Sequence, residues 1–134
     1  MSGRVFCDTS VLIRYFAEDD APRGLAAARL IDSDAQLFVS TAVLIELTHA
    51  LRSSHGMTNP TVAGLLVTFL SRANVELVDA DKSSVVTAVF WTQNASARRI
   101  PDAILTAAAA GAGVDFIATF DERFASPTVP VRLL

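Results

Sequence analysis

Short apolar segments alternate with helical patterns along the whole chain, and this alternation constrains the fold more than any other feature of the sequence. Parallel strands cannot be joined by a tight turn, so they need longer crossover connections, which are usually helices. The alternation therefore predicts an α/β domain in which a parallel sheet of about five strands is covered by helices. The segments expected to form strands are 5–7, 37–39, 75–78, 116–118 and 129–134. Pro130 cannot donate a hydrogen bond, so we expect the fifth strand at an edge.

The helical segments begin and end at recognisable signals. They are expected at 10–16, 22–31, 42–54, 60–70 and 101–110, with a further helix after Asp81. Pro22 and Pro101 suit the first turn of a helix, where the missing backbone N–H is not needed. The apolar residues from Val62 to Leu70 recur at the spacing of one helix face. That face is expected to pack against the core or against another chain.

The composition is that of one folded domain over residues 1–134. The chain is 51% hydrophobic and 19% charged, with a net charge of −3, which suits a single core and gives no overall basic field for nucleic acid. No segment approaches the roughly 20 consecutive apolar residues of a membrane helix. Cys7 is the lone cysteine, and only about three apolar residues precede Asp8, too few for a signal peptide. We therefore expect a cytoplasmic protein without a membrane partner.

Four acids stand at the ends of predicted strands or inside apolar patterns. Asp8 follows the first strand, and Asp121 follows the fourth. Asp102 lies at the start of a helix, and Glu46 interrupts an apolar run. Each has a structural explanation, because acids cap helices, are favoured near helix N-termini and occupy solvated helix faces. In an open parallel sheet, however, the carboxyl ends of strands share one edge, and distant residues converge there.

The four acids together point to a metal centre. Carboxylates a few ångströms apart repel one another, so a cluster of four needs cations. Oxygen ligands without cysteine or histidine suit Mg²⁺ or Mn²⁺ rather than zinc. Such ions would also attract an anionic phosphodiester to a chain whose net charge is negative. The pattern therefore predicts a site for divalent cations and a nucleic-acid substrate.

Four motifs give the chain a resemblance to PIN-domain nucleases, in particular to VapC-type toxins of toxin-antitoxin pairs. They are "DTSVL", "STAVLIEL", "PDAILTAAA" and "IATFDERF", in this order, and the resemblance covers nearly the whole chain. The resemblance implies a three-layer α/β/α PIN-like domain with a central parallel sheet of about five strands. It also implies a Mg²⁺ or Mn²⁺ centre and endoribonuclease activity restrained by an antitoxin.

Position by position, the resemblance assigns the acidic centre to Asp8, Glu46, Asp102 and Asp121, as catalytic and metal-binding residues. Thr119 is implied as the hydroxyl that supports it. The chain departs from the family at Asp121, where relatives often carry Asn, and at Arg123, where they often carry an acid. Many relatives have Asn where Ser10 stands, and either side chain can hydrogen-bond a neighbouring carboxylate.

The function expected from these residues is metal-dependent hydrolysis of RNA phosphodiester bonds by the toxin of a VapBC-type pair. A metal-bound water would supply the hydroxide that attacks phosphorus. The expected partners are the RNA substrate, a cognate antitoxin and a second copy of the chain. Arg98 and Arg99 are either contacts for RNA phosphates or part of a solvated loop. The alternative function is that of a catalytically inactive PIN-like protein that binds a partner.

Overall fold

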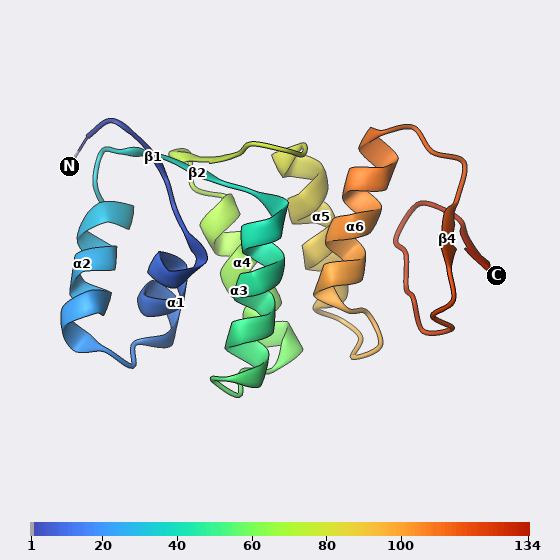
Figure 1. Cartoon of the computed structure of the whole chain (residues 1–134), viewed down its shortest axis with the longest axis horizontal. Coiled ribbons are helices and arrows are strands. Elements are labelled where there is room, and N and C mark those ends of the chain that lie inside the picture. Colours follow the sequence, from blue (N-terminus) through green and yellow to red (C-terminus); the bar gives the residue numbers. More distant parts are fainter. Residues whose placement is uncertain (1) are drawn as a thin grey trace.

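The computed structural model describes residues 2–134, which form six helices and five short strands in alternation (Figure 1). The strands are β1 (Arg4–Phe6), β2 (Gln36–Val39), β3 (Val75–Leu77), β4 (Ile117–Thr119) and β5 (Val131–Leu133). The helices are α1 (Thr9–Ala17), α2 (Ala21–Ile31), α3 (Thr41–Ser53), α4 (Asn59–Leu70), α5 (Lys82–Thr92) and α6 (Ile100–Gly111). Each expected strand and helix is present with slightly shifted ends, so the α/β alternation is confirmed.

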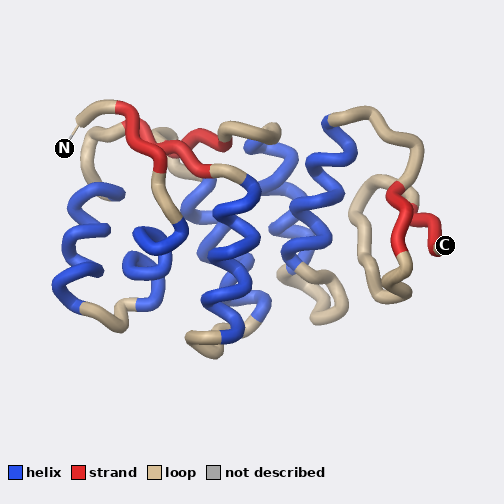
Figure 2. The backbone as a smooth tube through the Cα atoms, viewed as in Figure 1, coloured by secondary structure: helices blue, strands red, loops and turns tan. Residues whose placement is uncertain are grey.

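The strands form two parallel sheets rather than one. The first sheet has the order β1-β2-β3, with Val5 opposite Leu37 and Leu37 opposite Val75. The second consists of β4 and β5, with Ile117 opposite Val131. In Figure 2 the first sheet runs along the top of the left half of the molecule and the second lies at its right-hand end, and in Figure 1 α6 stands between the other helices and β4.

The expectation of one central sheet of about five strands is therefore wrong, although the parallel direction of the strands is confirmed. The physical reason is that a local sequence pattern predicts where each strand forms. Which strands pair with one another depends instead on how the intervening helices pack. Here α6 packs against α5 and α3, and β4 emerges beyond α6. As a result, β1 and β4 do not share a sheet edge.

The helix starts follow from the local sequence. Side chains of the residues just before five of the helices accept a hydrogen bond from a backbone N–H of the first turn: Asp8, Asp20, Ser40, Thr58 and Asp81. Such caps satisfy N–H groups that have no partner inside the helix. The exception is α6, whose cap position holds Arg99 and has no side-chain capping bond. This exception matters for the site described below.

The core lies between the first sheet and the helices. Leu37 and Val39 of the central strand β2 are fully buried. The apolar stripe of α4 is also buried in this core, since Val62 and Leu66 are inaccessible to solvent and Phe69 is 1% exposed. The stripe therefore packs against its own chain instead of remaining free for a partner. No residue of β4 or β5 belongs to the buried core.

Candidate functional site

Asp8 is placed by β1 and by the start of α1. The strand ends at Phe6, Cys7 is buried, and the chain turns so that Asp8 caps the helix. The Asp8 carboxylate accepts hydrogen bonds from the Ser10 hydroxyl at 2.7 Å and from the Ser10 backbone N–H at 3.2 Å. These bonds, the hydroxyl first, hold the pKa of Asp8 below its usual value. Asp8 is thus exposed and ionised, and both of these hydrogen bonds come from a neighbour two residues away.

Asp102 and Asp121 are brought together by one arginine. Asp102 lies in the first turn of α6 and is only 8% exposed, whereas Asp121 follows β4. Arg99 donates through Nε to Oδ2 of Asp102 at 3.0 Å, and through Nη2 to Oδ2 of Asp121 at 2.5 Å. The bond between Arg99 and Asp121 lowers the pKa of the carboxyl and raises that of the guanidinium. Two of the four predicted acids therefore converge on a shared cation.

The turn after β4 orients Asp121. Thr119 Oγ1 accepts a hydrogen bond from the backbone N–H of Asp121 at 3.0 Å. Oδ1 of Asp121 accepts one from the backbone N–H of Arg123 at 2.9 Å. Together these bonds fix the carboxylate so that Oδ2 faces Arg99. The hydroxyl of Thr119 therefore lies where it supports Asp121, next to the acid pair.

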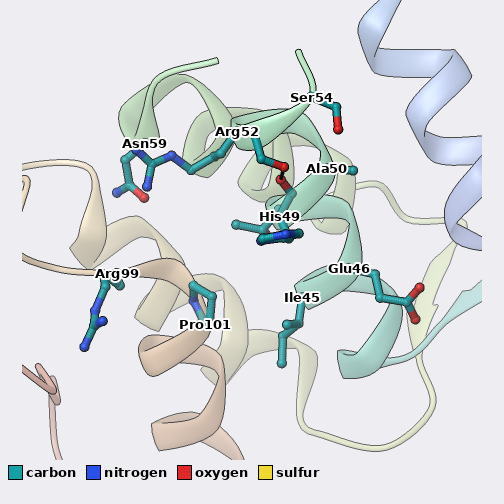
Figure 3. A pocket seen from close by; sticks show the side chains of 11 residues that line it. Ile45, Glu46, His49, Ala50, Arg52, Ser54, Asn59, Arg99 and Pro101 are labelled. Carbon is teal, nitrogen blue, oxygen red and sulfur yellow. Dashed lines mark hydrogen bonds between the residues drawn. The ribbon is translucent and has the colours of Figure 1, made fainter. Parts of the chain in front are cut away.

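Glu46 lies on the exposed side of α3 and lines a cavity of about 790 Å³. His49 and Arg52 line the same cavity from α3, and Arg99 and Pro101 line it from the start of α6. Figure 3 shows the Glu46 carboxylate pointing away from Arg99 and Pro101. An exposed carboxylate needs no partner to balance the cost of burial. Glu46 therefore borders the cavity without joining the acid pair.

The two arginines before α6 have different partners. Arg98 lies over the ring of Trp91, with 4.3 Å from the guanidinium carbon to the ring centroid, and donates to the Trp91 carbonyl at 3.0 Å. Arg99 instead binds the two carboxylates. Both side chains are therefore held by specific contacts, while both residues remain partly exposed to solvent. The sequence alone gave no signal that separates them, since the two are adjacent.

One acid at the first sheet was missed by the sequence analysis. Asp79 stands two residues after β3, as Asp8 stands two residues after β1. Its carboxylate accepts from the backbone N–H of Thr41 at 2.9 Å and from the Thr41 hydroxyl at 2.7 Å. This contact ties the end of β3 to the start of α3, which carries Glu46. The recurring position after a strand was the signal that would have identified it.

The residues fit a divalent cation only in part. All four predicted ligands offer hard oxygen atoms, the donor type that Mg²⁺ and Mn²⁺ prefer. Asp102 and Asp121 already share one cation, the Arg99 guanidinium. Over residues 2–134, however, no three His, Cys, Asp or Glu side chains lie close enough to hold one metal ion. Neither Asp8 nor Glu46 therefore joins the pair in this arrangement, and the four acids do not form one centre.

Comparison with known families places this geometry in context. The chain matches the family model described as PIN domain over residues 5–128, nearly its whole length, and it belongs to the PIN domain family. PIN domains are generally nucleases, a class of hydrolase that acts on nucleic acid, and typically use divalent metal ions. A search of the curated proteins found no match. Within the described residues, no helix combines the length and apolar character needed to cross a membrane.

Proposed function

We propose that this PIN domain is a metal-dependent endoribonuclease, the toxin of a VapBC-type toxin-antitoxin pair. The observation that carries the proposal is the pairing of Asp102, which is nearly buried, with Asp121 around one cation. A carboxylate removed from water is costly unless a positive charge accompanies it. Two carboxylates on different elements that share one cation make a place built to hold positive charge. A centre that cleaves a phosphodiester also has to hold positive charge, because its substrate is an anion.

The proposal keeps Asp8, Glu46, Asp102 and Asp121 as catalytic and metal-binding groups, with Asp8 and Glu46 lying outside the Asp102–Asp121 pair in the present arrangement. A bound Mg²⁺ or Mn²⁺ would lower the pKa of a water and offset charge on the phosphate. Asp102 and Asp121 offer their oxygens from fixed positions, and Thr119 holds the Asp121 backbone in place. Asp8 is kept ionised by Ser10.

The cavity beside the acid pair is the proposed path of the RNA. It is lined by the cationic side chain of Arg52, which is exposed, and by Arg99. His49, which is exposed on α3, adds a ring nitrogen that can donate a hydrogen bond. Positive groups next to the acids would hold backbone phosphates, because phosphate contacts position a nucleic acid irrespective of its sequence.

The antitoxin and a second copy of the chain are the proposed protein partners, and the cytoplasm is the proposed location. Several large apolar side chains are exposed, among them Phe120 at 80% and Phe90 at 56%. Exposed apolar groups of this size support a protein-binding role, since they gain free energy when a partner covers them. The surface of α4 is not among them, because its apolar stripe is buried.

The direct test is cleavage of a mixed RNA pool by the purified chain with Mg²⁺, with Mn²⁺ and with a chelator. We expect cleavage with either ion, none with the chelator, and a loss of roughly 100-fold or more in Asp8→Asn. Sequencing of the new RNA ends would give the cleavage site. An inactive PIN-like binding protein would instead cleave nothing under any condition while still binding a partner protein. Cleavage that persists in Asp8→Asn would remove that residue from the site.

A further inference from the structure

Arg99 is the side chain whose position calls for explanation. It occupies the cap position of α6, where Ser, Thr, Asp or Asn would satisfy the free N–H groups, and it makes no side-chain capping bond. The N-terminus of a helix carries partial positive charge, which disfavours a cation there. The guanidinium is therefore in an unfavourable place with respect to its own helix. Its two carboxylate partners, Asp102 and Asp121, offset that cost.

Arg99 contacts both of the carboxylates that would hold a metal ion at this pair. The guanidinium binds Oδ2 of Asp102 with one nitrogen and Oδ2 of Asp121 with another. Oδ1 of Asp121 is already engaged by the Arg123 backbone. An arginine fork suits two separate carboxylate oxygens, because its donors are fixed in one plane. The guanidinium therefore occupies one oxygen of each of the two carboxylates that would hold a divalent ion.

Charge favours a divalent ion at this pair over the arginine alone. Two ionised carboxylates carry two negative charges, and one guanidinium balances only one of them. Arg99 is the cation that contacts both carboxylates, and the charge of Arg123 acts in addition on Asp121 alone. A doubly charged ion would balance both carboxylates.

Arg99 also has room to leave. Its side chain is 40% exposed, and it lines the cavity of about 790 Å³ that Arg52 and His49 line from α3. A guanidinium that moves further into water gains solvation, and partly exposed ion pairs such as these contribute little to stability. Its release therefore requires no rearrangement of the buried core.

We propose that Arg99 is a built-in competitor of the divalent cation: it occupies the Asp102–Asp121 pair in the metal-free protein and is displaced when the ion binds. The inference rests on the proposed function, because it presumes that the pair receives a metal. Arg99 thus positions both carboxylates before the metal arrives and sets the metal concentration at which the site fills. It acts through Asp102 and Asp121 and is a positioning residue.

The test is calorimetric titration of Mn²⁺ into three metal-free proteins: the wild type, Arg99→Met and Arg98→Met. Methionine keeps an apolar side chain of similar length and removes one positive charge. The two variants thus have the same net charge, but only one loses contacts to carboxylates. We expect Mn²⁺ affinity to rise roughly 5- to 30-fold in Arg99→Met and to stay within about twofold of wild type in Arg98→Met. Circular dichroism would verify that each variant is folded.

A second pair of variants keeps the test decisive if Arg99→Met does not fold. Arg99→Lys keeps the charge but offers a single nitrogen, so we expect a smaller rise in affinity. Asp121→Asn removes one of the two partners of Arg99, so in that background Arg99→Lys should tighten Mn²⁺ binding less than it does in the wild type. Equal affinities in Arg99→Met and Arg98→Met, or weaker binding in Arg99→Met, would overturn the competition alone. Failure of every variant to bind Mn²⁺ would overturn both the competition and the metal dependence of the proposed nuclease.

Discussion

The carboxyl ends of β1 and β4 are built alike but are stabilised by different means. In each case an aspartate stands two residues after the strand, Asp8 after Phe6 and Asp121 after Thr119. Each accepts a backbone N–H from the residue two positions further on. Asp8 adds only the hydroxyl of Ser10, whereas Asp121 binds Arg99, 22 residues away in the sequence. The comparison shows that one local motif can remain a helix cap or become half of a charged pair, depending on tertiary packing.

The two strand ends also differ in the structure that supports them. β1 belongs to a three-stranded sheet whose central strand is partly buried in the core. β4 pairs only with β5, and neither contributes to that core. Burial of apolar groups is the main source of stability, so the turn that carries Asp121 is expected to open at lower cost than the turn that carries Asp8.

The largest expected effect is on the free energy of unfolding, and it tests whether the first sheet is better supported than the second. Leu37→Ala removes a fully buried side chain next to β1 and should lower the free energy of unfolding by about 2–5 kcal/mol. Ile117→Ala removes a half-buried side chain of β4 and should cost about 1 kcal/mol. Urea denaturation followed by circular dichroism measures both. Equal costs for the two variants would mean that the second sheet is as well supported as the first.

An intermediate effect is expected from pH and salt in the metal-free protein. The pKa values of Asp8 and Asp121 are both held below the ordinary value. Each carboxylate therefore stabilises the fold above the ordinary Asp pKa of about 4, and this contribution is lost as the pH falls through the lower folded value. The partner of Asp121 is charged, so about 1 M salt should raise its pKa toward normal.

The pKa of Asp8 should change little with salt, because its donors belong to a neutral serine. Carboxyl resonances followed by NMR across a pH titration give both values in one experiment. An equal salt response of the two residues would contradict the assignment of Arg99 as the dominant partner of Asp121.

The smallest expected effect is on the pKa of Asp8, whose hydrogen bonds come from a residue close in the sequence. Ser10→Ala removes the hydroxyl that donates to Asp8 and keeps the backbone N–H. The pKa of Asp8 should rise by a fraction of a unit and that of Asp121 should not change, because Ser10 donates to Asp8 whereas Asp121 is bound by Arg99 and the Arg123 backbone. The same NMR titration reads both residues. A Ser10→Ala variant with an unaltered Asp8 pKa would show that the backbone N–H alone sets it.

Much of the site was predictable from the sequence because its parts are local. The position of an acid after a strand, the cap at Asp8 and the place of Asp102 in the first turn of α6 all depend on residues close in sequence. The sheet arrangement was not predictable, because the strands are three or four residues long and β4 finds its partner through helix packing. The partner of Arg99 was equally hidden, since Arg98 and Arg99 are chemically identical.

The sequence by itself determined the α/β alternation, the parallel direction of the strands and which carboxylates stand at the ends of elements. These depend on hydrophobic periodicity and capping, which act over a few residues. Only the tertiary structure decided that the strands divide into two sheets and that Arg99 joins Asp102 to Asp121. It also left Asp8 and Glu46 outside that pair. The reason is that charge pairing depends on distances in space, and those distances are set by helix packing across the whole domain.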